Sequence, residues 1–409
     1  MSEEKPKLRQ DLEVIPSNVR GQRIFIIRDP LGLVDMPIVV GQQAVELLRM
    51  LDGSNTVSDI EVAMVRGHGG MLMPAREVEK TIKQFDSLFL LENERYRKAR
   101  KTTVDDFLSA EVREPCLAGK SYPADSLKLA ERLDSILALL THHGKPGREL
   151  VGLVAPHIDF DAGARGYCAA YQRVYRARFD LVVILGTGHS MANGLFCLTE
   201  KDFKTPFGIA RTNREIVKKL RAAGGGCVIE DDLPHRREHS IELQLVFLQH
   251  VLESRDFEIV PILCGSFAGE LKKCSRASEI EGVAPLLDVL KDVVKDSAGK
   301  VLVVAGVDLS HVGPKFGDDR AGAMIIPESQ EHDEALLDAL CRQDAAAFWA
   351  ESKGVEDRYH VCGFSALACM LEVLPRCDTR VLLYDTWHEG PTMSAVSFAA
   401  AAFTAQPPA

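Results

Sequence analysis

The 409-residue chain lacks the features that mark several common classes of protein. It has no run of 18 apolar residues, so no segment is expected to span a membrane. Its N-terminus is charged and lacks the apolar core of a signal peptide, which predicts a cytoplasmic protein. Lysine and arginine total 49 against 59 aspartates and glutamates, a net charge of −10, and there is no dense basic tract. Nucleic-acid binding driven by phosphate contacts is therefore not expected.

Nucleotide-binding and disulfide motifs are also missing. No GxGxxG or GxxxxGKS/T pattern follows an apolar run, so dinucleotide and P-loop sites have no support. The ten cysteines include no CxxC pair, and scattered cysteines in a reducing cytosol are usually small buried hydrophobic residues. A cysteine is therefore a candidate for a site only where its neighbours support one.

The length exceeds that of one ordinary domain and predicts two or three. Residues 1–96 are expected to form a small α+β unit, because helical patterns are followed there by a short strand. In chain order, we expect a strand at 23–28, a helix at 41–51, a second helix that starts at 55, a third helix at about 75–88 and a strand at 88–92.

Helices followed by a small hairpin indicate a winged-helix-like module. The hydrophobic spacing, together with the turn at 52–57 (DGSNTV), resembles that of PqqD-like peptide-recognition domains. The resemblance implies that this module binds a peptide or a partner protein; a docking or capping domain without a ligand is the alternative. Residues 97–112 are polar and are predicted to be a linker.

From residue 113 to 409, apolar runs alternate with helical patterns. This order is typical of an α/β domain whose mostly parallel sheet is flanked by helices. The predicted strands are 151–155, 181–186, 259–263, 301–307 and 381–384.

Polar residues gather where these strands end. Four of the strands are each followed by a histidine, namely His157, His189, His311 and His388. Asp159 and Asp308 follow two of the same strands. Because ligands bind at the carboxyl ends of the strands in open α/β sheets, we expect these side chains to share one edge and form a site.

Two further segments are candidates for the same site. Glu238, His239 and Glu242 lie at the start of a predicted helix, close to one another, although acids at a helix start are also common as a solvated first turn. Cys362 follows His360 and precedes an apolar helix, a position that lowers the pKa of a thiol and favours metal binding.

Imidazole and thiolate donors suit iron, copper or zinc, whereas magnesium and calcium prefer oxygen ligands. Three protein ligands would leave coordination positions open, as in catalytic rather than structural sites. Asp308 and His311 could orient such ligands or move protons.

Seven segments in this part of the chain resemble the Memo family, whose fold is similar to that of class III extradiol ring-cleaving dioxygenases. They occur in the family's order: 118–123 (AGKSYP), 155–157 (APH), 184–189 (ILGTGH), 205–208 (TPFG), 238–242 (EHSIE), 308–311 (DLSH) and 362–363 (CG). The chain is most similar to the bacterial group called AmmeMemoRadiSam system protein B. The name of that group implies an AMMECR-like protein and a radical SAM enzyme as partners.

The resemblance implies one metal held by His157, His189 and Cys362, with Asp308 and His311 close to it. Related ring-cleaving dioxygenases have a carboxylate where this family has the cysteine, so their activity does not carry over directly. The family often has HAGY where this chain has HIDF at 157–160. Asp159 is therefore an additional carboxylate, a candidate fourth ligand or base.

The sequence thus predicts an oxidoreductase that uses iron, with copper or zinc as alternatives, and that works with a radical SAM partner. A non-catalytic metal-binding adaptor that recognises a peptide or partner protein is one alternative. A zinc hydrolase with Asp308 or Glu238 as its base is another. The candidate catalytic residues are Asp159, Glu238, His239, Asp308 and His311.

Overall fold

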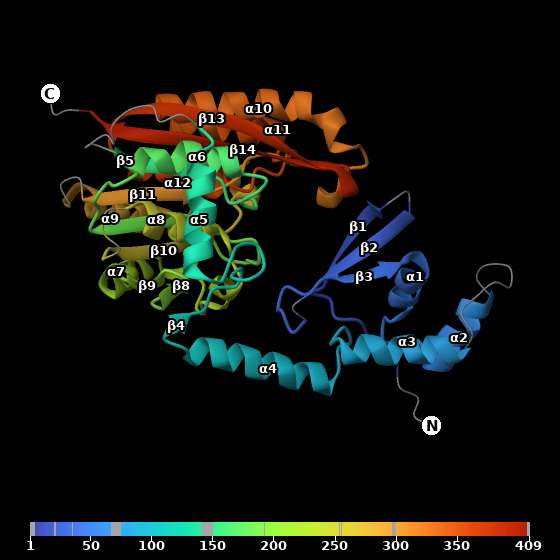
Figure 1. Cartoon of the computed structure of the whole chain (residues 1–409). Helices are drawn as coiled ribbons and strands as arrows, with labels where there is room; N and C mark the ends of the chain where they lie inside the picture. The colour runs from blue at the N-terminus through green and yellow to red at the C-terminus, as the bar shows by residue number, and fades with distance from the viewer. Residues whose placement is uncertain are drawn as a thin grey trace. The chain divides into compact units, whose positions relative to one another are not determined.

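The computed structural model describes residues 5–19, 22–34, 36–66, 75–140, 150–191, 193–252, 254, 256–296 and 300–406. The chain divides into two compact units (Figure 1). The first comprises Met1–Ser109 with Gly390–Met393, and the second comprises Ala110–Glu389 with Ser394–Ala409.

The N-terminal unit begins with an antiparallel sheet in the order β1-β2-β3 and continues with helices. Its elements are β1 (Glu13–Val19), β2 (Gln22–Arg28), β3 (Ile38–Gly41), α1 (Gln42–Met50), α2 (Val57–Arg66), α3 (Ala75–Ser87) and α4 (Glu94–Ser109). The apolar faces of α1, α2 and α3 meet in one core around Leu47, Ile60, Val78 and Phe85. Burial of these faces holds the unit together, because helices this short are marginal alone.

The predicted strand at 23–28 and the three predicted helices are confirmed as β2, α1, α2 and α3. The strand expected at 88–92 is wrong, because Leu91 forms only an isolated bridge with Leu8. The winged-helix-like interpretation expected a small hairpin after the helices, but the sheet precedes them. The order of the elements thus gives the PqqD-like resemblance no support, and it stays a prediction. Most of the predicted linker at 97–112 is helical, because residues 97–109 lie in α4.

The second unit is built on an 11-stranded sheet in the order β12-β14-β5-β11-β6-β10-β9-β8-β4, with β13 beside β14 and β7 beside β10. The strands are β4 (Val112–Arg113), β5 (Leu150–Ala155), β6 (Leu181–Thr187), β7 (Phe196–Leu198), β8 (Asp202–Thr205), β9 (Gly208–Thr212), β10 (Glu258–Cys264), β11 (Val301–Gly306), β12 (His311–Val312), β13 (Cys377–Glu389) and β14 (Ser394–Ala405). At its centre β5, β11, β6, β10 and β9 are parallel. The predicted α/β fold with a mostly parallel sheet is confirmed.

Helices cover both faces of this sheet (Figure 1). They are α5 (Ser126–Leu137), α6 (Ala164–Tyr171), α7 (Arg214–Gly224), α8 (Ser240–Val251), α9 (Val283–Asp296), α10 (Gly322–Arg342), α11 (Ala345–Val355) and α12 (Phe364–Val373). Side chains alternate across the strands: in β6, Val182 packs with the α5, α6 and α8 side, and Val183 with the α7, α9 and α12 side. Strands buried on both faces explain the continuous apolar runs of the sequence.

Among the described residues, no helix is both long enough and apolar enough to cross a membrane. Helix α8 is the most enclosed of the helices that flank the site, since Ser240 to Gln249 are all buried. Its first turn is therefore not the solvated helix start that acidic residues at 238 and 242 also allowed.

The close packing of α8 on β11 predicts the effect of a substitution at Gly306. A Cβ there would lie 2.5 Å from the carbonyl oxygen of Ser240 and 2.7 Å from Cγ of Gln244. We expect Gly306→Ala to lower the free energy of unfolding by about 1–3 kcal/mol, measured by urea denaturation. The control is Gly354→Ala in α11, where a Cβ meets nothing within 4 Å. That change should be neutral or stabilise by up to about 1 kcal/mol, and equal losses in both variants would contradict the packing argument.

Candidate metal centre

Three segments bring nitrogen and sulfur donors to one point at the carboxyl edge of the sheet. His157 follows β5, His189 follows β6, and Cys362 precedes α12. One donor atom from each lies within 4.8 Å of the others. The structure therefore brings together the three residues that the family resemblance implies as ligands.

His157 is held by a backbone contact that leaves one ring nitrogen facing the other donors. Its Nδ1 lies 2.8 Å from the carbonyl oxygen of Gly306, which requires Nδ1 to carry a proton and donate it. Nε2 then faces Sγ of Cys362 at 3.5 Å. Burial opposes a charge on this ring, but the carboxylate of Asp308 and the thiolate of Cys362 outweigh burial and raise the pKa of His157 to about 9.

Cys362 has the electrostatic surroundings of a thiolate. Burial alone would raise its pKa, but His157 and His311 lower the pKa of Cys362 to about 5. The backbone approaches closely here, because a Cβ on Gly363 would lie 2.6 Å from the carbonyl oxygen of Asp308. The glycine after the cysteine is thus required for Cys362 to reach the centre.

His189 is oriented by the buried carboxylate of Glu238. Its Nδ1 lies 3.0 Å and 3.1 Å from the two carboxylate oxygens, and its backbone N–H donates to Oε2 at 3.0 Å. Glu238 also accepts the backbone N–H groups of His239 at 2.8 Å and Ser240 at 3.0 Å. Despite burial, the neighbouring His189 holds the pKa of Glu238 well below its usual range. Glu238 therefore directs Nε2 of His189 toward the centre.

His239 is a third imidazole in the same cluster. Its ring centroid lies 5.0 Å from that of His189 and 5.3 Å from that of His157. His189, Glu238 and His239 form a second possible donor group. Because both oxygens of Glu238 already accept backbone N–H groups, we favour the set with Cys362. Burial is the main cause that lowers the pKa of His239 to about 4, so this ring is neutral at pH 7.

Asp308 and His311 border the centre, as expected from the strand that precedes them. Oδ1 of Asp308 accepts the backbone N–H groups of His157 at 3.0 Å and Ile158 at 3.3 Å, and Oδ2 lies 3.6 Å from Nε2 of His157. Nδ1 of His311 lies 2.9 Å from the carbonyl oxygen of Leu309. Asp308 thus fixes the backbone and the electrostatics of the first histidine.

Among the described residues, neither Asp159 nor His388 belongs to a group of donors that could hold a metal ion. Asp159 is exposed, and its Oδ1 accepts the N–H of Asp161 in the turn before α6. His388 lies within β13, paired with Ala395, because this strand continues to Glu389 instead of ending at Tyr384. The expectation that His388 follows a strand end was therefore wrong.

An ion pair that the sequence did not reveal supports the turn before α8. The fully buried Arg113 donates to the carboxylate of Glu242, to the carbonyl oxygen of Glu238 at 2.6 Å and to that of His235 at 3.0 Å. Tyr122 donates to the same carboxylate at 2.5 Å. Residues 113 and 242 are too far apart in the chain for any spacing rule to join them.

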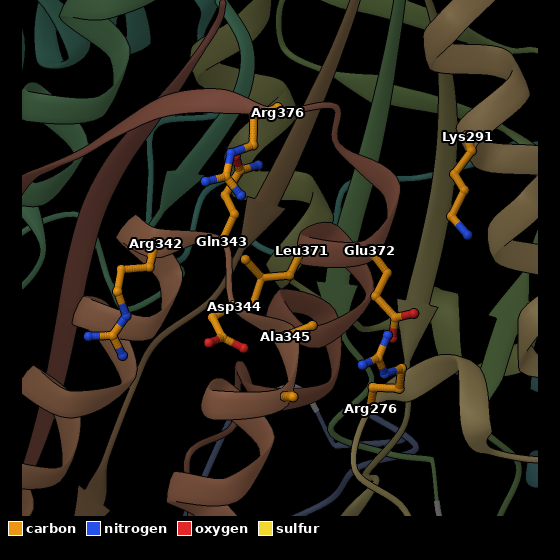
Figure 2. A pocket seen from close by; sticks show the side chains of 10 residues that line it. Arg276, Lys291, Arg342, Gln343, Asp344, Ala345, Leu371, Glu372 and Arg376 are labelled. Carbon is orange, nitrogen blue, oxygen red and sulfur yellow. The ribbon is translucent and has the colours of Figure 1, made fainter.

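Two hollows differ in their relation to this centre. A cavity of about 240 Å³ is lined by His189 and Cys362. A wider depression of about 740 Å³ is lined by basic and acidic side chains that are spread rather than convergent (Figure 2). It lies at the far end of α12, by Glu372, and several of its charges have neighbouring partners, such as Lys291 with Asp288 at 2.8 Å. The smaller cavity is the one in contact with the donors.

The Arg113–Glu242 pair should matter far more for stability than an ion pair at the surface. Arg113→Met leaves the Glu242 carboxylate buried without its cation, and we expect a loss of about 3–5 kcal/mol in the free energy of unfolding. Lys204→Met, which breaks an exposed pair with Glu114 at 3.0 Å, should cost less than about 1 kcal/mol. Urea denaturation of both variants measures the difference, and similar losses would refute it.

The lowered pKa of Cys362 predicts selective alkylation of metal-free protein. Above about pH 5 this thiol is a thiolate, so iodoacetamide at pH 6.5 should modify Cys362 first. Cys341 is similarly half-buried, but burial raises its pKa, so it is the internal control. Peptide mass spectrometry over a pH series should show a rate for Cys362 that rises near pH 5. Labelling of both thiols only above pH 8 would show that the centre does not stabilise a thiolate.

Comparison with known proteins places this geometry in a family. The family described as "Memo-like protein" matches residues 113–402, more than half of the chain. A "MEMO1 family protein" of Aquifex aeolicus is 26% identical over 382 residues, covering 93% of this chain and 96% of the relative. Relatives with the same family name in Methanococcoides burtonii and Thermus thermophilus are each 28% identical, covering 67% and 83% of this chain and 93% and 97% of their own. The chain belongs to the Memo family.

Proposed function

We propose that this protein binds one transition metal through Nε2 of His157, Nε2 of His189 and Sγ of Cys362, and that it is a metal-dependent oxidoreductase. The observation that carries the proposal is the convergence of these three donors within 4.8 Å at the end of the parallel strands. Iron is the first candidate, and copper and zinc are the alternatives.

The residues fit such an ion in three ways. Two imidazoles and a thiolate form a donor set that suits iron, copper and zinc. The other ring nitrogen of each histidine is engaged, by Gly306 in one case and Glu238 in the other, which is typical of histidines that bind metal. The cavity on one side leaves space for a further ligand. A bound iron or copper ion would supply one-electron chemistry and open coordination positions.

The chain itself supplies orientation and proton transfer. Glu238 fixes the ring of His189, and Asp308 fixes the backbone at His157. His239 is neutral at pH 7, and its Nδ1 lies 3.2 Å from Glu238, so its Nε2 carries the lone pair that can accept a proton from a bound substrate. We therefore propose His239 as the base of the site.

The partners stay predictions. Association with a radical SAM enzyme and an AMMECR-like protein, and the binding of a peptide by the N-terminal unit, rest on resemblance alone. The resemblance to the Memo family implies a fold similar to that of extradiol dioxygenases, which supports an oxidoreductase without identifying its substrate.

Metal analysis of protein purified without oxygen tests the proposal. We expect near-stoichiometric iron or copper in the wild type, and its loss in His157→Ala and Cys362→Ala, because each removes a donor. Glu238→Gln should weaken metal binding by about 10- to 100-fold through the orientation of His189. Cys341→Ala, which removes a cysteine outside the centre, is the matched control and should retain the metal. Circular dichroism verifies that each variant is folded.

Other results would redirect the function. Zinc in place of a redox metal would favour a hydrolase with a metal-activated water. A folded wild type that binds no transition metal would refute the metal site and leave an adaptor protein.

A further inference from the structure

The cavity beside the candidate metal centre, of about 240 Å³, is lined partly by apolar residues. They include Phe267, Leu271, Val361 and Phe364, whose side chains are buried. Cys264 and Met191 add two polarisable sulfur atoms. Pockets for drug-sized ligands are generally larger, so this one suits a small molecule with an apolar body, such as a single ring.

The ionisable groups of the cavity give it a charge preference. Besides His189 and Cys362, they are Asp357 and His360. Of the described residues that line the cavity, none is a lysine or arginine. Burial raises the pKa of Asp357, and its carboxylate accepts the backbone N–H of Val361. Asp357 is the acidic side chain among these lining residues, and without a lysine or arginine beside it its carboxylate would attract a cationic ligand more than an anionic one.

The segment that presents Asp357 has an unusual backbone. Glu356, Asp357 and His360 all have positive φ angles, 53°, 57° and 50°, which are uncommon for residues other than glycine. The N–H of Asp357 donates to the backbone carbonyl oxygen of Ser352 at 3.2 Å, and the N–H of His360 donates to the backbone carbonyl oxygen of Asp357 at 2.9 Å. Such conformations persist where the surroundings enforce them, and they cluster at ligand-binding sites.

We propose that this cavity binds a small organic cation, with its apolar body against Phe267 and Phe364 and its ammonium group on the carboxylate of Asp357. The inference rests on the proposed function in one respect, because it takes the cavity as the place where the substrate meets the metal. The charge preference itself belongs to the chain and does not require a metal.

Binding to the metal-free full-length protein tests the inference. Three probes share a ring and differ in charge: 2-phenylethylamine, 2-phenylethanol and phenylacetate. By isothermal titration calorimetry at pH 7.5, we expect the amine to bind about tenfold more tightly than the alcohol, and phenylacetate to bind most weakly. Asp357→Asn should weaken the binding of the amine by about tenfold and leave that of the alcohol unchanged.

Glu356→Gln is the matched control. Its carboxylate is adjacent in the chain and its backbone also has a positive φ angle, but it pairs with Lys272 at 2.7 Å and does not line the cavity. This variant should bind all three probes as the wild type does. If the Asp357→Asn variant still binds the alcohol, its cavity is folded. If that variant does not fold, the relative affinities of the wild type for the three probes still test the inference.

Equal affinity of the wild type for amine and alcohol, tighter binding of phenylacetate, or no binding of the amine would overturn the inference. Metal analysis of untreated wild type separates it from the proposed function. A preference for the amine in a protein that binds no metal would refute only the function, whereas a metal-binding protein without that preference would refute only this inference.

Discussion

The buried Arg113–Glu242 ion pair is the interaction on which the geometry of the candidate metal centre depends. Arg113 also donates to the carbonyl oxygens of Glu238 and His235, so one guanidinium fixes both the first turn of α8 and the chain just before it. The segment just before α8 carries Glu238, whose carboxylate orients His189. A buried charge is costly unless it is paired and fully hydrogen-bonded, and this requirement permits only one arrangement of the turn.

The electrostatics of the donors result from their close approach. Without a metal, and against the effect of burial, Asp308 and the thiolate of Cys362 raise the pKa of His157 to about 9. His157 and His311 in turn lower the pKa of Cys362 to about 5, although burial opposes this too. Metal binding would require Nε2 of His157 to lose its proton, while the thiolate is already formed. The negative charge of Cys362 and Asp308 therefore favours a cation at this point, whether a proton or a metal ion.

The sheet and most of the donors could be predicted because they obey local rules. Apolar runs predict strands such as β5 and β6, and the loops after parallel strands meet at one edge of a sheet, which places His157 and His189 together. Cys362 could be selected from ten cysteines by its position after His360 at the start of an apolar helix, but its role as a ligand beside His157 and His189 required the family resemblance. Arg113 could not be found, because its partners Glu238 and Glu242 lie far away in the chain. Asp357 could not be found, because the cavity that it lines is assembled from segments distant in the chain. His388 was misplaced because β13 extends five residues beyond its apolar stretch, to Glu389.

The centre is closed on one side and open on the other, and this asymmetry connects it to the cavity. His157 is 2% exposed and hydrogen-bonded to the carbonyl oxygen of Gly306 in β11. Helix α8 packs on this glycine so closely that no Cβ would fit there. The side chain of His189 is 38% exposed and lines the cavity together with Cys362. A ligand could therefore reach the donors from the cavity that His189 and Cys362 line together with Asp357 and His360. In the proposed arrangement, selectivity depends on the segment with positive φ angles, while the candidate metal donors are fixed by the core of the sheet.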